Sequence, residues 1–70
     1  MNERQIGEVI RKKRKDLRLT QIELADKAGV VYQTISNIER GEKVTFSTIL
    51  KICKILGLTL IIANEAVSVK

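Results

Sequence analysis

The feature that most constrains this chain is the segment 21–40, in which two short helical patterns are separated by one glycine. Gly29 ends the first pattern, and Ala25 is small where a second helix must cross closely. Ile35 and Ile38 are spaced to lock the second helix onto the first. A generic helical hairpin meets one or two of these demands by chance. The segment as a whole therefore predicts a helix-turn-helix.

Local signals mark the ends of these two helices. Thr20 and Glu23 form a capping box, which predicts that the first helix begins at this point. The second helix is predicted over Tyr32–Arg40, with Gly41 as its stop. Val31 precedes it and is a poor N-cap, because its side chain has no oxygen to accept a hydrogen bond.

Two further helical patterns flank this segment. One runs from Glu3 to Leu17, with Asn2 as its cap, and the other begins after Thr45 and is closed by Gly57. The apolar positions of the first are Ile6, Val9, Ile10 and Leu17, and those of the second are Ile49, Ile52, Cys53 and Leu56. Because these positions follow helical spacing, we expect each helix to bury one face.

The tail from Leu58 to Lys70 has a different pattern. Its β-branched residues and the alternating Val-Ser-Val end favour a strand over residues 58–64. A short fifth helix capped by Thr59 is the alternative, but the first turn of such a helix would hold no acidic residue.

The predicted strand needs a partner, because a lone strand leaves its backbone groups unpaired. Residues 66–69 are too short and too close to pair well, so a second copy of the chain is the expected partner. This argument predicts a homodimer whose interface consists of Leu58, Leu60, Ile61 and Ile62.

Charge and composition limit the possible chemistry. The net charge is +5, and residues 1–18 hold seven basic residues against three acidic ones, which indicates a polyanionic partner such as nucleic acid. The chain has no His and a single Cys. It therefore has no Ser/His or Cys/His catalytic pair, no imidazole metal site and no internal disulfide. We expect no enzymatic activity, no metal and no cofactor.

The length of 70 residues indicates a single domain over residues 1–70, with no room for a separate ligand-sensing domain. We therefore expect no small-molecule ligand. No apolar stretch is long enough to span a membrane, and the N-terminal segment has no apolar core typical of a secretion signal. We expect a cytoplasmic protein with no membrane partner.

Residues 4–60 resemble the XRE/Cro/C1-type helix-turn-helix domain of phage repressors and bacterial regulators. The resemblance is carried by the motifs LTQ, ELA, KAGV and TISNIERG. It implies an all-α, compact four-helix, lambda-repressor-like domain that binds double-stranded operator DNA as a dimer. The tail LTLIIANE is similar to the HipB-like group, whose members end in a strand, and here that strand would pair across the dimer.

The resemblance also implies residue roles. The base-reading residues would be Tyr32, Gln33, Ser36 and Asn37, the phosphate-binding residues would be Gln21, Thr34, Arg40 and Lys43, and the structural ion pair would join Arg14 and Glu39. Gln33 and Asn37 are four residues apart and share one helix face, and their amides suit bidentate contact with adenine. The chain departs from the family at Arg18, where glycine is common, and at Val31, where a Ser cap is common.

The leading hypothesis is therefore a sequence-specific transcriptional regulator, a repressor that binds a palindromic operator as a homodimer in the bacterial nucleoid. One alternative is an antitoxin that represses its own operon and also binds a toxin protein, although no residue identifies such a partner. A protein-binding adaptor with the same fold is a further alternative, which the basic recognition face disfavours.

Overall fold

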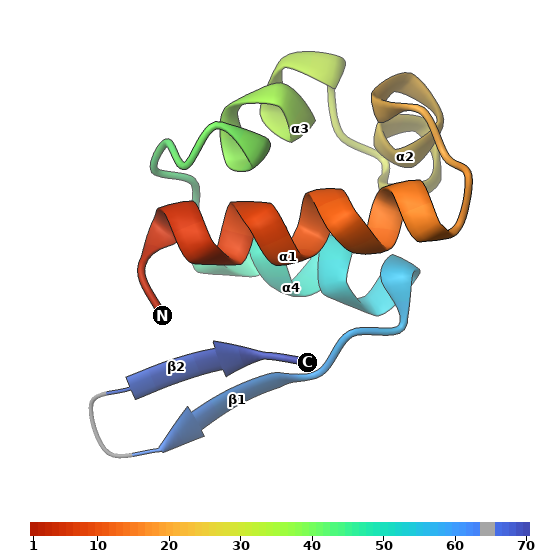
Figure 1. Ribbon diagram of the computed structural model, residues 1–70. Coiled ribbons are helices and arrows are strands. Elements are labelled where there is room, and N and C mark those ends of the chain that lie inside the picture. The colour runs from red at the N-terminus through yellow and green to blue at the C-terminus, as the bar shows by residue number, and fades with distance from the viewer. Residues whose placement is uncertain (64–65) are drawn as a thin grey trace.

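The computed structural model describes residues 1–63 and 66–70 as four helices followed by a two-stranded sheet (Figure 1). The elements are α1 (Glu3–Asp16), α2 (Gln21–Ala28), α3 (Tyr32–Glu39), α4 (Phe46–Leu56), β1 (Leu60–Ala63) and β2 (Ala66–Val69). The four predicted helices are thus confirmed, with ends close to those expected. Within these ranges, no helix is both long and apolar enough to cross a membrane.

Side-chain caps fix the starts of three helices. Asn2 and Thr20 each form a full capping box, and the Thr45 hydroxyl accepts from the Thr48 N–H. The Thr20 backbone N–H, followed by the Thr20 hydroxyl, holds the pKa of Glu23 below its ordinary value. Because the folded-state pKa is the lower one, this stabilisation is present at neutral pH and is lost as the pH falls through it.

The end of α1 shows why the departure at position 18 matters. Arg18 has a φ of 59°, in the left-handed region. Its N–H donates to the Lys15 carbonyl at 2.9 Å, and the Leu19 N–H donates to the Arg14 carbonyl at 3.0 Å. This pair of bonds is the Schellman motif, in which the left-handed position favours glycine. An arginine at this position stores backbone strain of about 1 kcal/mol.

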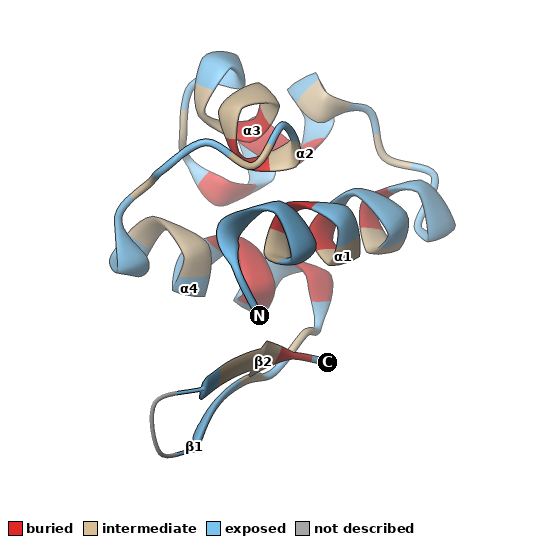
Figure 2. Ribbon diagram, turned by 60° about the vertical axis from the view of Figure 1, so that its left-hand side comes forward, coloured by how far each residue is buried: buried red, intermediate tan, exposed pale blue. Residues whose placement is uncertain are grey.

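The four helices bury one shared apolar core (Figure 2). It consists of Ile10, Leu24, Ala25, Ala28, Ile35, Ile38, Ile52 and Leu56. Leu17, which was expected in the buried stripe of α1, is instead exposed, because it lies beyond the last helical turn. Gly7 is buried where α1 crosses α3, and a Cβ at this position would overlap the Ile38 carbonyl oxygen. The close crossing therefore requires glycine.

The tail corrects the sequence-based prediction of its pairing. β1 pairs antiparallel with β2, with Leu60 opposite Val69 and Ala63 opposite Ala66. The expectation that residues 66–69 are too short and too close to pair is therefore wrong, and so is the fifth-helix alternative. Two four-residue segments that contain β-branched residues were sufficient to form the ladder.

The bounds of the predicted strand also change. Asn64, at its predicted end, lies outside the described residues. Leu58, at its predicted start, precedes β1 and donates its N–H to the Cys53 carbonyl at 2.8 Å in the turn that ends α4. Its side chain packs against the protein's own core. Leu58 therefore contributes to the core of its own chain, and its place in the dimer interface stays a prediction.

The hairpin has two edges with different surroundings. Thr59 and Lys70 exchange both backbone hydrogen bonds. Because bonded and non-bonded pairs alternate along an antiparallel ladder, the backbone groups of Ile61 face β2, whereas those of Leu60 and Ile62 face the outer edge of β1. The outer edge of β2 lies on the side nearer to the N-terminus (Figure 1), and the Met1 nitrogen donates to the Val67 carbonyl there at 2.7 Å.

We predict that Arg18→Gly stabilises the protein by about 1 kcal/mol relative to Arg18→Ala, because alanine keeps the left-handed strain and glycine relieves it. Both variants remove the same charge, so their difference isolates the backbone term. Urea unfolding followed by circular dichroism measures it. Equal stability of the two variants would contradict the assignment of strain to Arg18.

Candidate nucleic-acid interface

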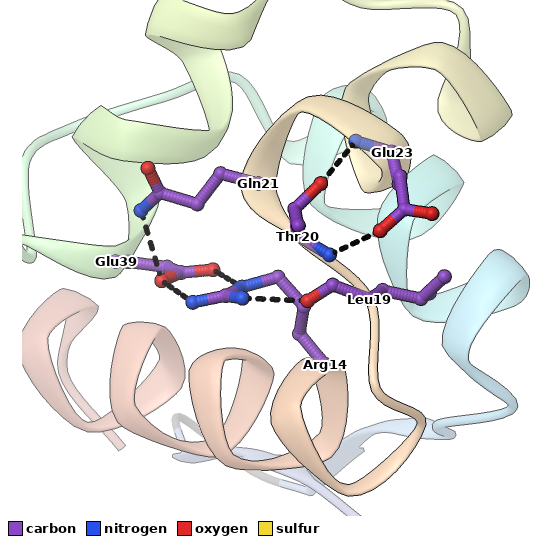
Figure 3. Close-up of polar contacts among 6 residues, drawn as sticks. All are labelled: Arg14, Leu19, Thr20, Gln21, Glu23 and Glu39. Carbon is purple, nitrogen blue, oxygen red and sulfur yellow. Dashed lines mark hydrogen bonds and ion pairs between the residues drawn. The ribbon is translucent and has the colours of Figure 1, made fainter.

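A buried ion pair joins α1 to α3 (Figure 3). Arg14 Nε donates to Glu39 Oε2 at 2.7 Å, and Arg14 Nη2 donates to Glu39 Oε1 at 3.0 Å. The two side chains are 10% and 3% exposed. Arg14 Nη1 donates in addition to the Leu19 carbonyl at 2.7 Å. Bidentate geometry and this third bond satisfy both charges, as a buried pair requires.

Gln21 extends the same contact to α2. As the first residue of that helix, it lies beside the pair, and its Nε2 donates to Glu39 Oε1 at 3.1 Å (Figure 3). The sequence predicted a phosphate-binding role for this residue. In the structure one of the two amide N–H groups of Gln21 is occupied by Glu39, and an amide carries two. Glu39 thus connects α1, α2 and α3.

The exposed face of α3 lies opposite this contact. Ile35 and Ile38 are buried against the core, whereas Tyr32 and Gln33 are exposed. Ser36 and Asn37 are half-buried, as is Thr34, which was expected to bind phosphate. The predicted base-reading residues therefore share the solvent-facing side of one short helix, and Ile35 and Ile38 anchor its other side.

The C-terminal end of α3 folds back on itself. The Glu42 N–H donates to the Asn37 carbonyl and the Gly41 N–H to the Ile38 carbonyl, both at 3.0 Å. Gly41 has a φ of 79°, and a Cβ there would also lie 2.9 Å from the Arg4 Cα. The turn therefore depends on glycine, and it returns residues 40 and 42 to the side of Asn37.

Four polar side chains on this surface are linked by hydrogen bonds: Gln33, Asn37, Arg40 and Glu42. Gln33 Nε2 donates to Asn37 Oδ1 at 2.9 Å, and Arg40 Nη2 donates to the same oxygen at 2.7 Å. Arg40 also pairs with Glu42, whose Oε2 lies 2.7 Å from Nη2 and 3.1 Å from Nε. Arg40, expected to bind phosphate, is therefore already paired with a carboxylate. Lys43, with the same expected role, is exposed.

Comparison with known families gives an independent assignment. A family model described as helix-turn-helix, of the XRE/Cro/C1 type, matches residues 10–62, which is most of the chain. The chain belongs to this family. It is accordingly a DNA-binding transcription regulator of the helix-turn-helix class. A comparison with curated proteins found no match.

Sequence reasoning missed two residues that shape this face. Gly7 allows α1 to approach α3 closely, and a glycine inside an amphipathic helical pattern was a signal of such an approach. Glu42 binds Arg40, and its position two residues after an arginine across a glycine turn gave only a weak signal. The contacts of both residues depend on the course of the backbone around α3, which the sequence pattern does not specify.

We predict strong coupling between Arg14 and Glu39 in the free energy of unfolding. Arg14→Met or Glu39→Leu alone leaves one buried charge unpaired, which costs about 3 kcal/mol, whereas the double variant replaces both charges with apolar groups. The double variant should therefore lose clearly less than the sum of the single losses, as measured by a double-mutant cycle in urea.

Gln21→Ala serves as the matched control, because it removes one hydrogen bond to Glu39 and no charge. We expect it to cost about 1 kcal/mol. Additive losses for Arg14 and Glu39 would contradict a strong interaction between the two charges.

Proposed function

We propose that this regulator is a repressor that reads a palindromic operator with α3 as a homodimer. The observation that carries the proposal is the exposed face of α3, on which two amide side chains are held beside basic residues by a rigidly anchored helix. Such a helix matches the width of the DNA major groove. This role belongs to a protein of the bacterial cytoplasm, bound to the chromosome.

The roles of the side chains follow from their chemistry. Gln33 retains its Oε1 acceptor and one N–H, which suits bidentate contact with adenine. Tyr32, Ser36 and Asn37 supply the remaining base contacts. The proposed phosphate contacts come from Gln21, Thr34, Arg40 and Lys43, and the N-terminus of α2 adds backbone N–H groups. For Arg40, the bonds to Glu42 and Asn37 use Nε and Nη2, so a phosphate contact would come from Nη1 with Glu42 still in place.

The outer edge of β1, rather than a lone strand, supports the proposed homodimer. Among the described residues, the outward backbone groups of Leu60 and Ile62 have no hydrogen-bond partner within the chain, whereas Met1 bonds to the outer edge of β2. Ile61 and Ile62 are 40% and 59% exposed. A two-fold axis beside β1 and perpendicular to the sheet would pair β1 antiparallel with its copy, extend the hairpin to a four-stranded sheet and place a second strand next to these side chains. It would present two recognition helices to successive major grooves, about 34 Å apart.

We predict that Gln33→Ala weakens binding to a selected operator by roughly 1–3 kcal/mol and leaves binding to random duplex DNA little changed, because base contacts specify and phosphate contacts do not. Fluorescence anisotropy at fixed salt measures both affinities. Equal losses on the two DNAs would contradict base reading by Gln33.

Lys43→Ala provides the matched control on the same face. It should weaken binding to both DNAs equally and reduce the slope of log K against log salt by about 1. A salt dependence that is nearly flat in the parent would instead favour the protein-adaptor alternative.

For the dimer, we predict that Ile62→Pro gives a monomer at micromolar concentration, because proline removes the outward N–H of β1 and leaves the bonds to β2 in place. Val67→Pro is the matched control, since the Val67 N–H also faces outward but on the edge that Met1 occupies, and we expect it to stay dimeric. Sedimentation velocity separates the two states. A parent that is monomeric, or an Ile62→Pro variant that stays dimeric, would contradict pairing through β1.

A further inference from the structure

The Asn37 side-chain oxygen is held by two donors at once. Arg40 Nη2 lies 2.7 Å from it, and Gln33 Nε2 lies 2.9 Å from it. A guanidinium has donors only, so the Asn37 atom that faces Arg40 must be the oxygen. The Gln33 atom that faces this same oxygen must then be its nitrogen. The two contacts therefore fix the orientation of both amides.

Two hydrogen bonds fill both lone pairs of an amide oxygen. Asn37 is therefore left with its Nδ2–H₂ group, which can donate but cannot accept. Gln33 differs, because its Oε1 stays free beside one remaining N–H. Bidentate adenine contact, which needs an acceptor and a donor on one amide, is thus open to Gln33 and closed to Asn37.

The Arg40 side chain is itself held in place by a second residue. Glu42 accepts from both Nε and Nη2 of Arg40, and the left-handed turn at Gly41 carries Glu42 back beside α3. The pair is more than half exposed on each side, so its own contribution to stability is small. The structural consequence of the pair is the direction of the Arg40 guanidinium toward Asn37.

We propose that Arg40 is a positioning residue for DNA sequence recognition, which fixes Asn37 as a donor to a base acceptor in the major groove. The proposal rests on the proposed base-reading role of α3. Guanine, adenine and thymine each present an acceptor in that groove, whereas cytosine presents the N4–H₂ donor. Asn37 therefore discriminates against cytosine at the base that it faces.

The test compares the parent with Arg40→Met, which removes the donor and the charge, and with Lys43→Met, which removes a charge elsewhere on the same face. Each protein selects its preferred sequences from a randomised duplex library. We expect the parent to disfavour cytosine at one position of each half-site, and Arg40→Met to reduce that discrimination by about fivefold to tenfold at that position alone. Lys43→Met should keep every base preference and lose affinity uniformly.

The free proteins supply a second readout. Relaxation of the Asn37 side-chain ¹⁵N should show an ordered amide in the parent and a more mobile one in Arg40→Met, and the backbone spectrum of each variant shows whether it is folded. Unchanged cytosine discrimination in Arg40→Met would overturn the proposal, with or without a more mobile amide, and would leave Arg40 as a phosphate contact. If the parent selects no sequence at all, the base-reading function itself is wrong.

Discussion

The arrangement of the helices depends on the buried pair between Arg14 and Glu39. A charge that is almost fully removed from water must be matched by an opposite charge and by further hydrogen bonds. Only one relative placement of the partners meets this requirement. Arg14 donates an additional bond to the Leu19 carbonyl, just before α2. Glu39 accepts another from Gln21, the first residue of α2. One carboxylate therefore sets the positions of three helices, and with them the direction of the exposed face of α3.

This external support matters because α3 has little stability of its own. It has eight residues, its N-cap is Val31, and it is shorter than the length at which isolated helices become stable in water. Its order comes from tertiary contacts: Ile35 and Ile38 in the core, and the close approach of α1 that Gly7 permits. A short helix that is anchored on one side leaves its other side free for side chains chosen for recognition rather than for packing.

The sequence predicted the four helices because their signals are local: three begin at a side-chain cap, and three are followed by a glycine with a left-handed φ. The departure from the family's common glycine at position 18 marked the residue at which the structure has a left-handed backbone. The hairpin was missed because strand pairing is a choice between partners, and a sequence pattern ranks partners poorly. The orientation of the Asn37 amide was out of reach for another reason. It depends on Arg40 and Glu42, whose positions follow from a backbone turn rather than from periodicity.

We propose that α3, which the ion pair holds from the core side, is the surface that contacts DNA. The most direct test is a titration of ¹⁵N-labelled protein with duplex DNA at low salt, followed by backbone and side-chain amide shifts. We expect the largest shifts at the side chains of Gln33 and Asn37 and in the first turn of α2, with residues 60–63 and 66–69 little affected. Shifts confined to the hairpin, or no shifts at all, would contradict it.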